Sequence, residues 1–286
     1  MASIKRLLIR ANSIWKKEGV DNLALQSWRY INRKASRGYI HGKFKDEIEI
    51  KVGSQSVKFD TTTLIAKDWF YPRLYYGEPH EPSLTRRILE TIEEDSVFYD
   101  IGAHVGYYTA ICAQKSPDGN VHSFELHPEA VGAIQKTLER NDLEALVNQS
   151  AVSDESGNTL RYTTEGPSIA IENDGEYEAN SVTLDRYTQD HESPDVIKID
   201  VEGHEYHVLK GAERVFDQSP PKHVFVEIHP NKLAQSGNQV NDVIEYLLEH
   251  EYLPKQFENH RVGGSNISSL NRRLITNTMV EFIHQR

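Results

Sequence analysis

The sequence predicts an α/β fold with a mostly parallel sheet, helices on both of its faces, and a helical and hairpin extension at the N-terminus. From residue 96 onward, short apolar strands alternate with helical segments. These strands are continuous apolar runs, which is typical of parallel strands buried on both faces. A turn containing two glycines follows the first strand, where open α/β sheets bind their ligands.

Residues 46–94 are predicted to form a hairpin, a stretch rich in aromatic residues and a helix. Alternating apolar residues on either side of Gly53 predict a hairpin over 46–60. We assign 1–60 to the N-terminal extension and 61–286 to the main domain. Clustered aromatic residues between 64 and 94, including Trp69 and Tyr75, are expected to form a lid, a substrate wall or part of the core. A helix is expected over 84–92.

The strands and helices of the main domain are predicted from the alternation of short apolar runs with segments of helical periodicity. Strands are expected at 97–101, 121–125, 147–152, 196–201 and 224–228, with two late strands near 253–257 and 275–282. Helices are expected at 106–113, from Pro128 onward, as one helix across 208–216, and at 243–248. The polar stretch 153–181 is interpreted as a long insertion.

Composition excludes several classes of protein. With 38% hydrophobic and 26% charged residues, the 286-residue chain has the composition of a soluble globular protein. The single cysteine, Cys112, excludes an intrachain disulfide and a cysteine-based zinc site. Apolar runs are too short for a spanning helix, and Arg10 interrupts the apolar start, unlike a secretion signal. We therefore expect a cytoplasmic protein.

Charge is divided unevenly along the chain. Residues 1–45 contain eleven Lys and Arg and two acids, a net of +9, so the remainder carries −20 of the total −11. An acidic body disfavours a general role in binding nucleic acid. Within the basic segment, aliphatic residues and Trp15 recur at helical spacing. Such a helix either packs on its own domain or lies peripherally on the inner face of a membrane.

The first strand of the alternation ends in a turn that predicts the cofactor. It reads Asp-Ile-Gly-Ala-His-Val-Gly over residues 100–106, and lacks the triple glycine of a nicotinamide-binding turn. A carboxylate there repels a pyrophosphate and suits the ammonium group of S-adenosylmethionine. Glu125 ends the next strand, where a carboxylate accepts hydrogen bonds from ribose hydroxyls. We place the following residues in the cofactor site: Asp100, Gly102, Ala103, His104, Gly106 and Glu125.

The segment 98–109 resembles the first motif of the FkbM family of S-adenosylmethionine-dependent methyltransferases. Four further segments are similar to the family in the same order: 151–154, 181–185, 196–212 and 226–230. The resemblance covers roughly residues 80–230 and implies a Rossmann-like class I methyltransferase fold, methyl donation from S-adenosylmethionine and, usually, an oxygen acceptor. It adds Ala151 to the cofactor site. His104 stands where the family often has Asn.

A second group of polar residues predicts the reaction site. Lys198 and Asp200 share one face of their strand because alternate residues point the same way. They are expected to meet polar residues of the next turn and of the neighbouring strand end, where the acceptor oxygen must be aligned and lose its proton. The candidates are Asp200, Lys198, His229, Glu227, Glu202 and His204. Asp200 or His229 is the expected base, Asp200 also faces the cofactor, Lys198 orients the acceptor, and Glu205 caps the following helix.

The same rim also offers ligands for a metal ion. Oxygen and imidazole groups of Asp200, His204, Glu227 and His229 suit Mg²⁺ or Mn²⁺. Because the chain lacks a close pair of the H-x₃-H type, we expect a metal-free site.

These features together predict an S-adenosylmethionine-dependent methyltransferase that acts on a hydroxyl of a sugar, a glycolipid or a lipid-linked glycan. Two alternatives are considered. A dinucleotide-dependent oxidoreductase is disfavoured by the acid that leads the glycine turn. A catalytically silent adaptor that docks through its basic N-terminus is disfavoured by Asp100, Glu125 and Asp200.

Overall fold

The computed structural model describes residues 45–53, 55–67, 79–165, 168–171, 174–257, 267–269, 274 and 276–285. The chain divides into two compact units, 1–45 and 46–286, and the second is described here. The predicted basic helix and the aromatic residues of 69–77 lie outside the described residues. Among the helices that are described, none is long and apolar enough to cross a bilayer.

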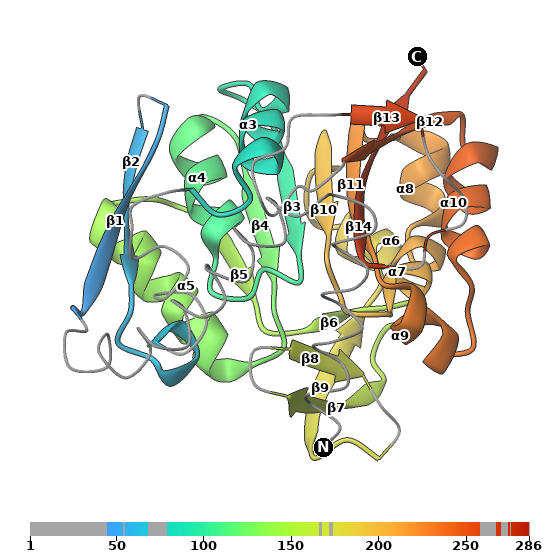
Figure 1. Ribbon diagram of the computed structural model, residues 1–286, viewed down its shortest axis with the longest axis horizontal. Coiled ribbons are helices and arrows are strands. Elements are labelled where there is room, and N and C mark those ends of the chain that lie inside the picture. The colour runs from blue at the N-terminus through green and yellow to red at the C-terminus, as the bar shows by residue number, and fades with distance from the viewer. Residues whose placement is uncertain are drawn as a thin grey trace, which may run out of the picture. The chain divides into compact units, whose positions relative to one another are not determined.

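A central sheet confirms the predicted α/β class (Figure 1). In the described residues its strand order is β13-β12-β14-β11-β10-β3-β4-β5. The parallel strands are β3 (Phe98–Ile101), β4 (Val121–Phe124), β5 (Leu146–Asn148), β10 (Val196–Ile199) and β11 (His223–Ile228). The antiparallel edge consists of β12 (Tyr252–Phe257), β13 (Ile267–Ser269) and β14 (Thr278–His284). The chain runs from β3 out to β5 and returns to β10 on the other side, so β3 and β10 flank the topological switch point.

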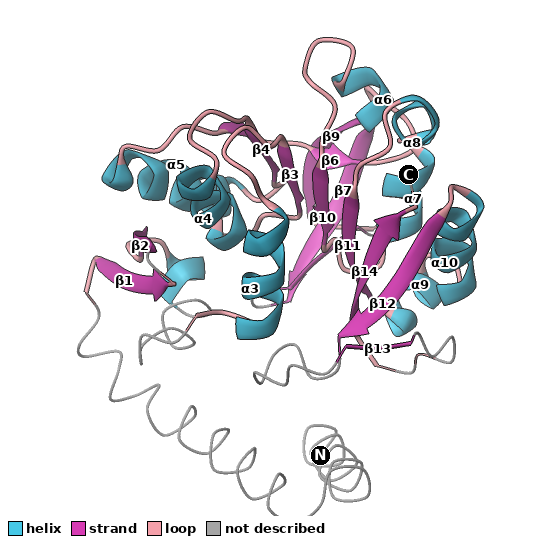
Figure 2. Cartoon of the chain, turned by 90° about the horizontal axis from the view of Figure 1, so that it is seen from above, coloured by secondary structure: helices cyan, strands magenta, loops and turns pink. Residues whose placement is uncertain are grey.

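Helices cover both faces of this sheet (Figure 2). On one side lie α3 (Pro82–Thr91), α4 (Tyr107–Lys115) and α5 (Pro128–Asn141). On the other lie α7 (Glu205–Lys210), α8 (Glu213–Gln218) and α10 (Val240–Glu249). Neighbouring residues of a strand point to opposite faces of the sheet and pack into different cores. Phe98 is buried in the core that includes α4, and Tyr99 is buried in the core that includes α8.

The predicted hairpin is present as β1 (Glu47–Val52) and β2 (Gln55–Asp60). Its buried residues Ile50 and Phe59 share a core with α4, and the Phe59 ring stacks on Tyr107 with centroids 5.4 Å apart. The carboxylate of Asp60 forms an ion pair of 3.0 Å with Arg140 of α5. The hairpin thus belongs to the compact unit that begins at Asp46.

Two sequence predictions are wrong, one for the strand at 147–152 and one for the helix at 208–216. The single strand expected at 147–152 is β5 followed by the separate strand β6 (Ala151–Val152), which belongs to another sheet. The single helix expected across 208–216 is broken between α7 and α8. A Cβ at Gly211 would overlap the carbonyl oxygen of Ser153, and the Asp185 carboxylate accepts from the amides of Arg214 and Val215 at the start of α8.

The polar insertion contains strands that the sequence does not reveal. β7 (Thr159–Glu165), β8 (Ser168–Ile171) and β9 (Tyr177–Val182) join β6 in a sheet of order β6-β9-β7-β8. Three short elements were likewise not predicted, namely α6 (Leu184–Tyr187), α9 (Pro230–Gln235) and β13.

Candidate functional site

The glycine turn between β3 and α4 is pressed against the end of β10. Gly102, His104 and Gly106 have φ values of 78°, 52° and 79°, in the left-handed region that favours glycine. A Cβ at Gly102 would overlap the backbone carbonyl oxygen of Asp200. A ligand held on this turn therefore lies next to the carboxyl end of β10.

Glu125 lies beside this turn, as predicted. It is buried, and its two oxygens accept from the backbone N–H groups of His104 and His127, each at 2.8 Å. Burial raises the pKa of Glu125 to about 7, against the lowering effect of these donors. Each carboxylate oxygen can accept a second hydrogen bond, so Glu125 could receive one from a hydroxyl of a ligand held on the turn.

Asp100 lies beneath the turn rather than on its surface. It is fully buried, accepts from the Thr109 hydroxyl at 2.7 Å, and lies 3.5 Å from the Lys198 ammonium nitrogen. Lys198 is also buried and lies 3.6 Å from Asp200. Burial lowers the pKa of Lys198, but Asp100 and Asp200 outweigh it and the pKa is raised. We therefore interpret Asp100 as a support for the turn and Lys198 as a cation joining the two strand ends.

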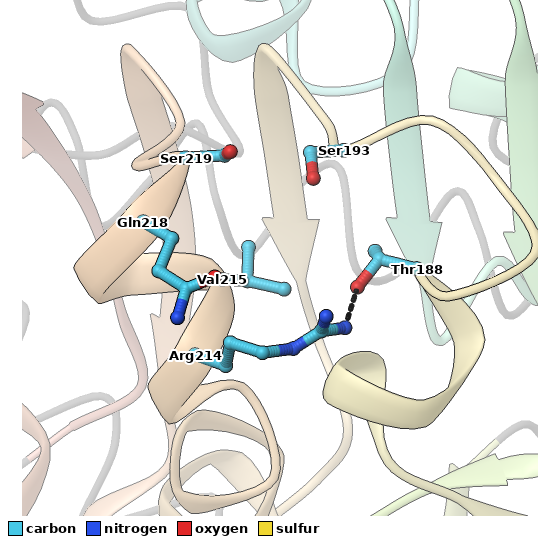
Figure 3. Close-up of a pocket in the computed structure, with 6 residues that line it drawn as sticks. All are labelled: Thr188, Ser193, Arg214, Val215, Gln218 and Ser219. Atoms are coloured by element: carbon cyan, nitrogen blue, oxygen red, sulfur yellow. Dashed lines mark hydrogen bonds between the residues drawn. The ribbon is translucent and has the colours of Figure 1, made fainter.

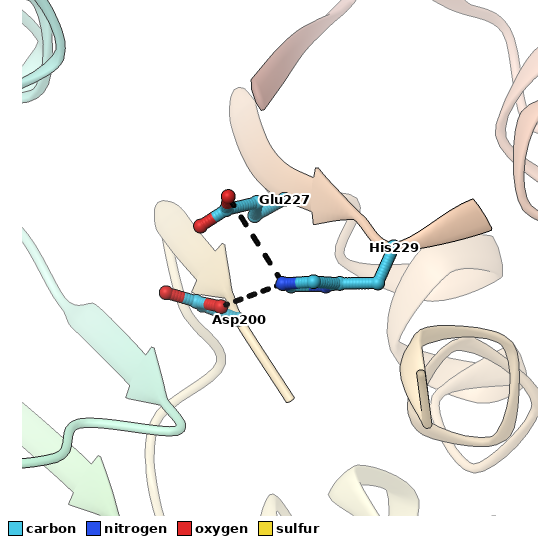
Figure 4. Close-up of side chains that lie close together, drawn as sticks. All are labelled: Asp200, Glu227 and His229. Atoms are coloured by element: carbon cyan, nitrogen blue, oxygen red, sulfur yellow. Dashed lines mark ion pairs between the residues drawn. The ribbon is translucent and has the colours of Figure 1, made fainter. Parts of the chain in front are cut away.

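His229 is the centre of a second cluster, at the ends of β10 and β11 (Figure 4). Its Nε2 lies 3.6 Å from Glu202, 3.8 Å from Asp200 and 4.0 Å from Glu227. His229 and Glu227 are buried, whereas the Asp200 side chain is 28% exposed. Burial lowers the pKa of His229, but the hydrogen bond to Glu205 and the neighbouring carboxylates raise it to about 9.

Glu205, which was expected to cap the helix that follows it, also contacts His229, and the sequence did not indicate this contact. Its Oε1 accepts from the Gly203 amide at 2.9 Å, near the start of α7, and lies 2.6 Å from Nδ1 of His229. The last acid of the Lys-Ile-Asp-Val-Glu-Gly-x-Glu segment was the only signal for it. Its partner His229 is 24 residues away, and only the fold brings the two side chains together.

His204 and Ala151 lie in other surroundings. Nε2 of His204 lies 2.9 Å from the Ser153 hydroxyl, and its ring stacks on His207 at 4.4 Å. Burial and His207 lower the pKa of His204 to about 4. Of the four metal ligands that the sequence offered as an alternative, Asp200, Glu227 and His229 lie together and His204 does not. Ala151 is buried in β6 and pairs with Ser181 of β9.

Three aromatic side chains close to Glu125 were missed. Tyr162 and Tyr177, from β7 and β9, stack with ring centroids 5.3 Å apart, and the His127 ring is 6.3 Å from Tyr177. Tyr177 remains exposed while Tyr162 is buried. The sequence could not find the two tyrosines because their strands were interpreted as a long insertion, and His127 was not singled out although it follows Glu125 by two residues.

A shallow pocket lies away from these clusters, between α8 and the segment before β10 (Figure 3). The guanidinium of Arg214 donates to the Thr188 hydroxyl there at 3.0 Å. None of the residues that line it belongs to the predicted sites.

The sequence was compared with protein-family models and with characterised proteins, and both comparisons found methyltransferases. A model of the methyltransferase FkbM domain matches residues 100–254. Hexuronic acid methyltransferase AglP of Haloferax volcanii is 29% identical over 177 residues, which cover 59% of this chain and 68% of that protein.

The solved structures that match this chain have much lower sequence identity. Precorrin-6y C5,15-methyltransferase of Geobacter metallireducens has a TM-score of 0.43 at 13% identity, covering 71% of this chain and 88% of its own. A SAM-dependent O-methyltransferase of Thermotoga maritima has a TM-score of 0.41 at 12% identity, covering 71% and 63%. The predicted enzyme class and its cofactor are confirmed by the family model, which includes the turn, Glu125 and the His229 cluster. Because this match extends over more than half of the sequence, the chain belongs to the FkbM family of S-adenosylmethionine-dependent methyltransferases.

Proposed function

We propose that the enzyme methylates a hydroxyl oxygen of a sugar, either free or within a lipid-linked glycan. The observation that carries this proposal is the position of Asp200. Its backbone packs against Gly102 of the cofactor turn, and its partly exposed carboxylate is a ligand-accessible acid at the end of β10. A methyl donor on the turn and a hydroxyl at Asp200 are therefore neighbours.

Residues of the turn and of β4 would hold the cofactor. The left-handed backbone at Gly102 and Gly106 allows close approach of a ligand, and Glu125 would accept from the ribose hydroxyls. When bound, S-adenosylmethionine supplies a methyl group activated by the positive sulfonium.

Asp200 then has two tasks. Its negative charge offsets the sulfonium, and its carboxylate accepts the proton that the hydroxyl loses. Lys198, 3.6 Å away and itself buried, holds that carboxylate in one orientation. A carboxylate held in one orientation can in turn hold the hydroxyl oxygen in line with the methyl group, and such positioning accounts for much of the rate enhancement in displacements of this kind.

The polar rim supports a sugar as the acceptor. Glu202 and Lys232, 2.8 Å apart and partly exposed, offer a hydrogen-bond acceptor and a donor next to Asp200. The ammonium group of Lys232 also matches a uronic acid carboxylate, in keeping with the substrate named for the Haloferax relative.

Two measurements test the proposal. Glycans and glycolipids from cells with and without the protein are compared by mass spectrometry, and the loss of one methylene equivalent, about 14 Da, is expected in the cells without it. The purified enzyme is then given labelled S-adenosylmethionine with a hexuronic acid or the matching neutral hexose. Label found only in a nitrogen or carbon position would contradict O-methylation.

The basic segment 1–45 further supports a location at a membrane surface. Its net charge of +9 would attract it to anionic lipids, where lipid-linked glycans are held.

A further inference from the structure

We propose that Asp200, Glu227 and His229 bind one divalent cation of the Mn²⁺ or Mg²⁺ type (Figure 4). The lack of an H-x₃-H pair made the sequence favour a metal-free site, but the fold assembles ligands from two strands instead. The role given to the ion rests on the proposed function, whereas the binding site itself does not.

The spacing of the three ligand atoms fits an ion between them. All lie within 4.8 Å of one another, and His229 Nε2 is 3.8 Å from Asp200 and 4.0 Å from Glu227. These distances are too long for hydrogen bonds. Ligands held about 2.1 Å from a common ion are separated by about 3–4 Å. Two carboxylates with one imidazole suit Mn²⁺, which accepts both oxygen and nitrogen.

The hydrogen bond between Glu205 and His229 is a second observation that favours a metal ion. The Nδ1 atom of His229 hydrogen-bonds to this fully buried carboxylate at 2.6 Å, so the other ring nitrogen faces Asp200 and Glu227. Histidines that bind metals almost always donate their second N–H to such a partner, which fixes the ring and its tautomer. Gly203 holds Glu205 in turn, through an amide hydrogen bond of 2.9 Å.

The charge around the cluster also favours a cation. Lys198 and Lys232 are the lysines paired with these carboxylates in the described chain. Lys198 pairs with Asp100 and Asp200, Lys232 pairs with Glu202, and Glu205 and Glu227 lie against His229, so three basic side chains meet five acids. Carboxylates withdrawn from water need compensating positive charge, and a divalent ion would supply it where His229 meets the acids.

The ion would assist the transfer by polarising the acceptor hydroxyl. In that step the acceptor oxygen attacks the methyl carbon of the sulfonium, and the carbon–sulfur bond breaks with its electron pair left on sulfur. The O–H bond breaks as the proton passes to the Asp200 oxygen that faces Lys198, while the other Asp200 oxygen faces His229 and the ion. The products are the methyl ether, S-adenosylhomocysteine and a protonated carboxylate.

The test measures Mn²⁺ binding directly. Full-length protein is treated with chelator, dialysed, and titrated with Mn²⁺ in the presence and absence of S-adenosylhomocysteine, with free Mn²⁺ followed by electron paramagnetic resonance. One Mn²⁺ per chain is expected. Glu227→Gln, and Glu205→Gln through its loss of orientation, should each weaken binding by about tenfold to a hundredfold.

A matched control is Asp217→Asn. Asp217 is an exposed carboxylate 3.4 Å from His250 Nε2, an acid–imidazole pair away from the cluster, so full Mn²⁺ affinity is expected in this variant. Circular dichroism and thermal unfolding show that each variant is folded. Absence of stoichiometric binding by folded wild-type protein, or wild-type affinity in Glu227→Gln, would overturn the site. Binding of Zn²⁺ but not Mn²⁺ would overturn the metal class.

The metal site and the proposed function fail in different ways. Sugar methylation at an unchanged rate in excess chelator would overturn the role of the ion and leave the function standing. Stoichiometric Mn²⁺ binding by a protein that methylates no sugar would overturn the function and leave the site standing.

Discussion

At the scale of single residues, Asp200 separates cofactor binding from chemistry. Asp200→Asn keeps the shape of the side chain and removes its charge, so affinity for S-adenosylhomocysteine should change little while turnover falls at least about a hundredfold. Calorimetry and product formation measure the two effects. Near-normal turnover would move the proton acceptor to Glu202, the other partly exposed acid beside His229.

Glu125→Ala should have the opposite effect. Loss of a carboxylate that accepts charge-assisted hydrogen bonds costs about 1.5–3 kcal/mol, and cofactor affinity should fall about tenfold to a hundredfold. Calorimetric titration with S-adenosylmethionine measures this change. Wild-type affinity in a folded variant would remove Glu125 from the cofactor site.

The main expected effect of Asp100→Ala is a loss of folding stability. Sequence reasoning treats Asp100 and Glu125 alike, but the Asp100 carboxylate is buried against Thr109 and Lys198. Its removal leaves Lys198 with Asp200 as its remaining close ion pair, so unfolding free energy should fall by about 3 kcal/mol. Urea denaturation tests this, and Thr109→Val, which removes a neutral partner, should cost less. Equal stability of Asp100→Ala and wild type would contradict it.

At the scale of elements, His122 of β4 makes stability depend on pH. It is buried, with Nδ1 2.8 Å from the Tyr187 hydroxyl, and burial lowers its pKa from 6.5 to about 4. The unfolded chain therefore takes up a proton near pH 6.5, before the folded chain does. The contribution of His122 to stability is complete above pH 6.5 and is lost as pH falls toward 4, by up to about 3 kcal/mol.

The measurement is urea denaturation at intervals between pH 7.5 and 4. The pKa of His204 is lowered to about 4 as well, so the informative quantity is the difference between wild type and His122→Asn. The wild type should lose more stability than the variant as pH falls. Parallel pH profiles for the two proteins would show that His122 stays uncharged or solvated in both states.

Strands β3, β4, β10 and β11 of the central sheet were predictable because each is a short, mainly apolar run buried on both faces, a pattern that can be read without tertiary information. The sheet of β7, β8 and β9 was not, since residues such as Thr159 and Glu178 are exposed and interrupt any apolar pattern. The helix break at Gly211 depends on Ser153, and the role of Glu205 depends on His229. The sequence thus placed the candidate residues at the strand ends, while contacts between distant parts of the chain determine which of their side chains meet.

At the scale of the whole molecule, the two compact units carry opposite charge. Residues 1–45 hold +9 and the remainder −20. Each basic residue close to an anionic surface contributes about 1 kcal/mol of attraction, which salt weakens. We therefore expect full-length protein to sediment with anionic liposomes at low salt and to be released at high salt. The 46–286 fragment should stay in solution and still bind S-adenosylmethionine.

The competing hypothesis is that the basic segment packs on the acidic body and serves stability. Deletion would then expose apolar surface and lower the melting temperature, and full-length protein would ignore liposomes. A full-length variant with Lys5, Arg6 and Arg10 replaced by Ser separates the two hypotheses without deleting the segment. If the membrane hypothesis holds, this variant loses liposome binding and keeps its melting temperature, because only charge at the lipid surface has been removed. A fall in melting temperature, together with wild-type protein that fails to bind anionic liposomes at low salt, would defeat it.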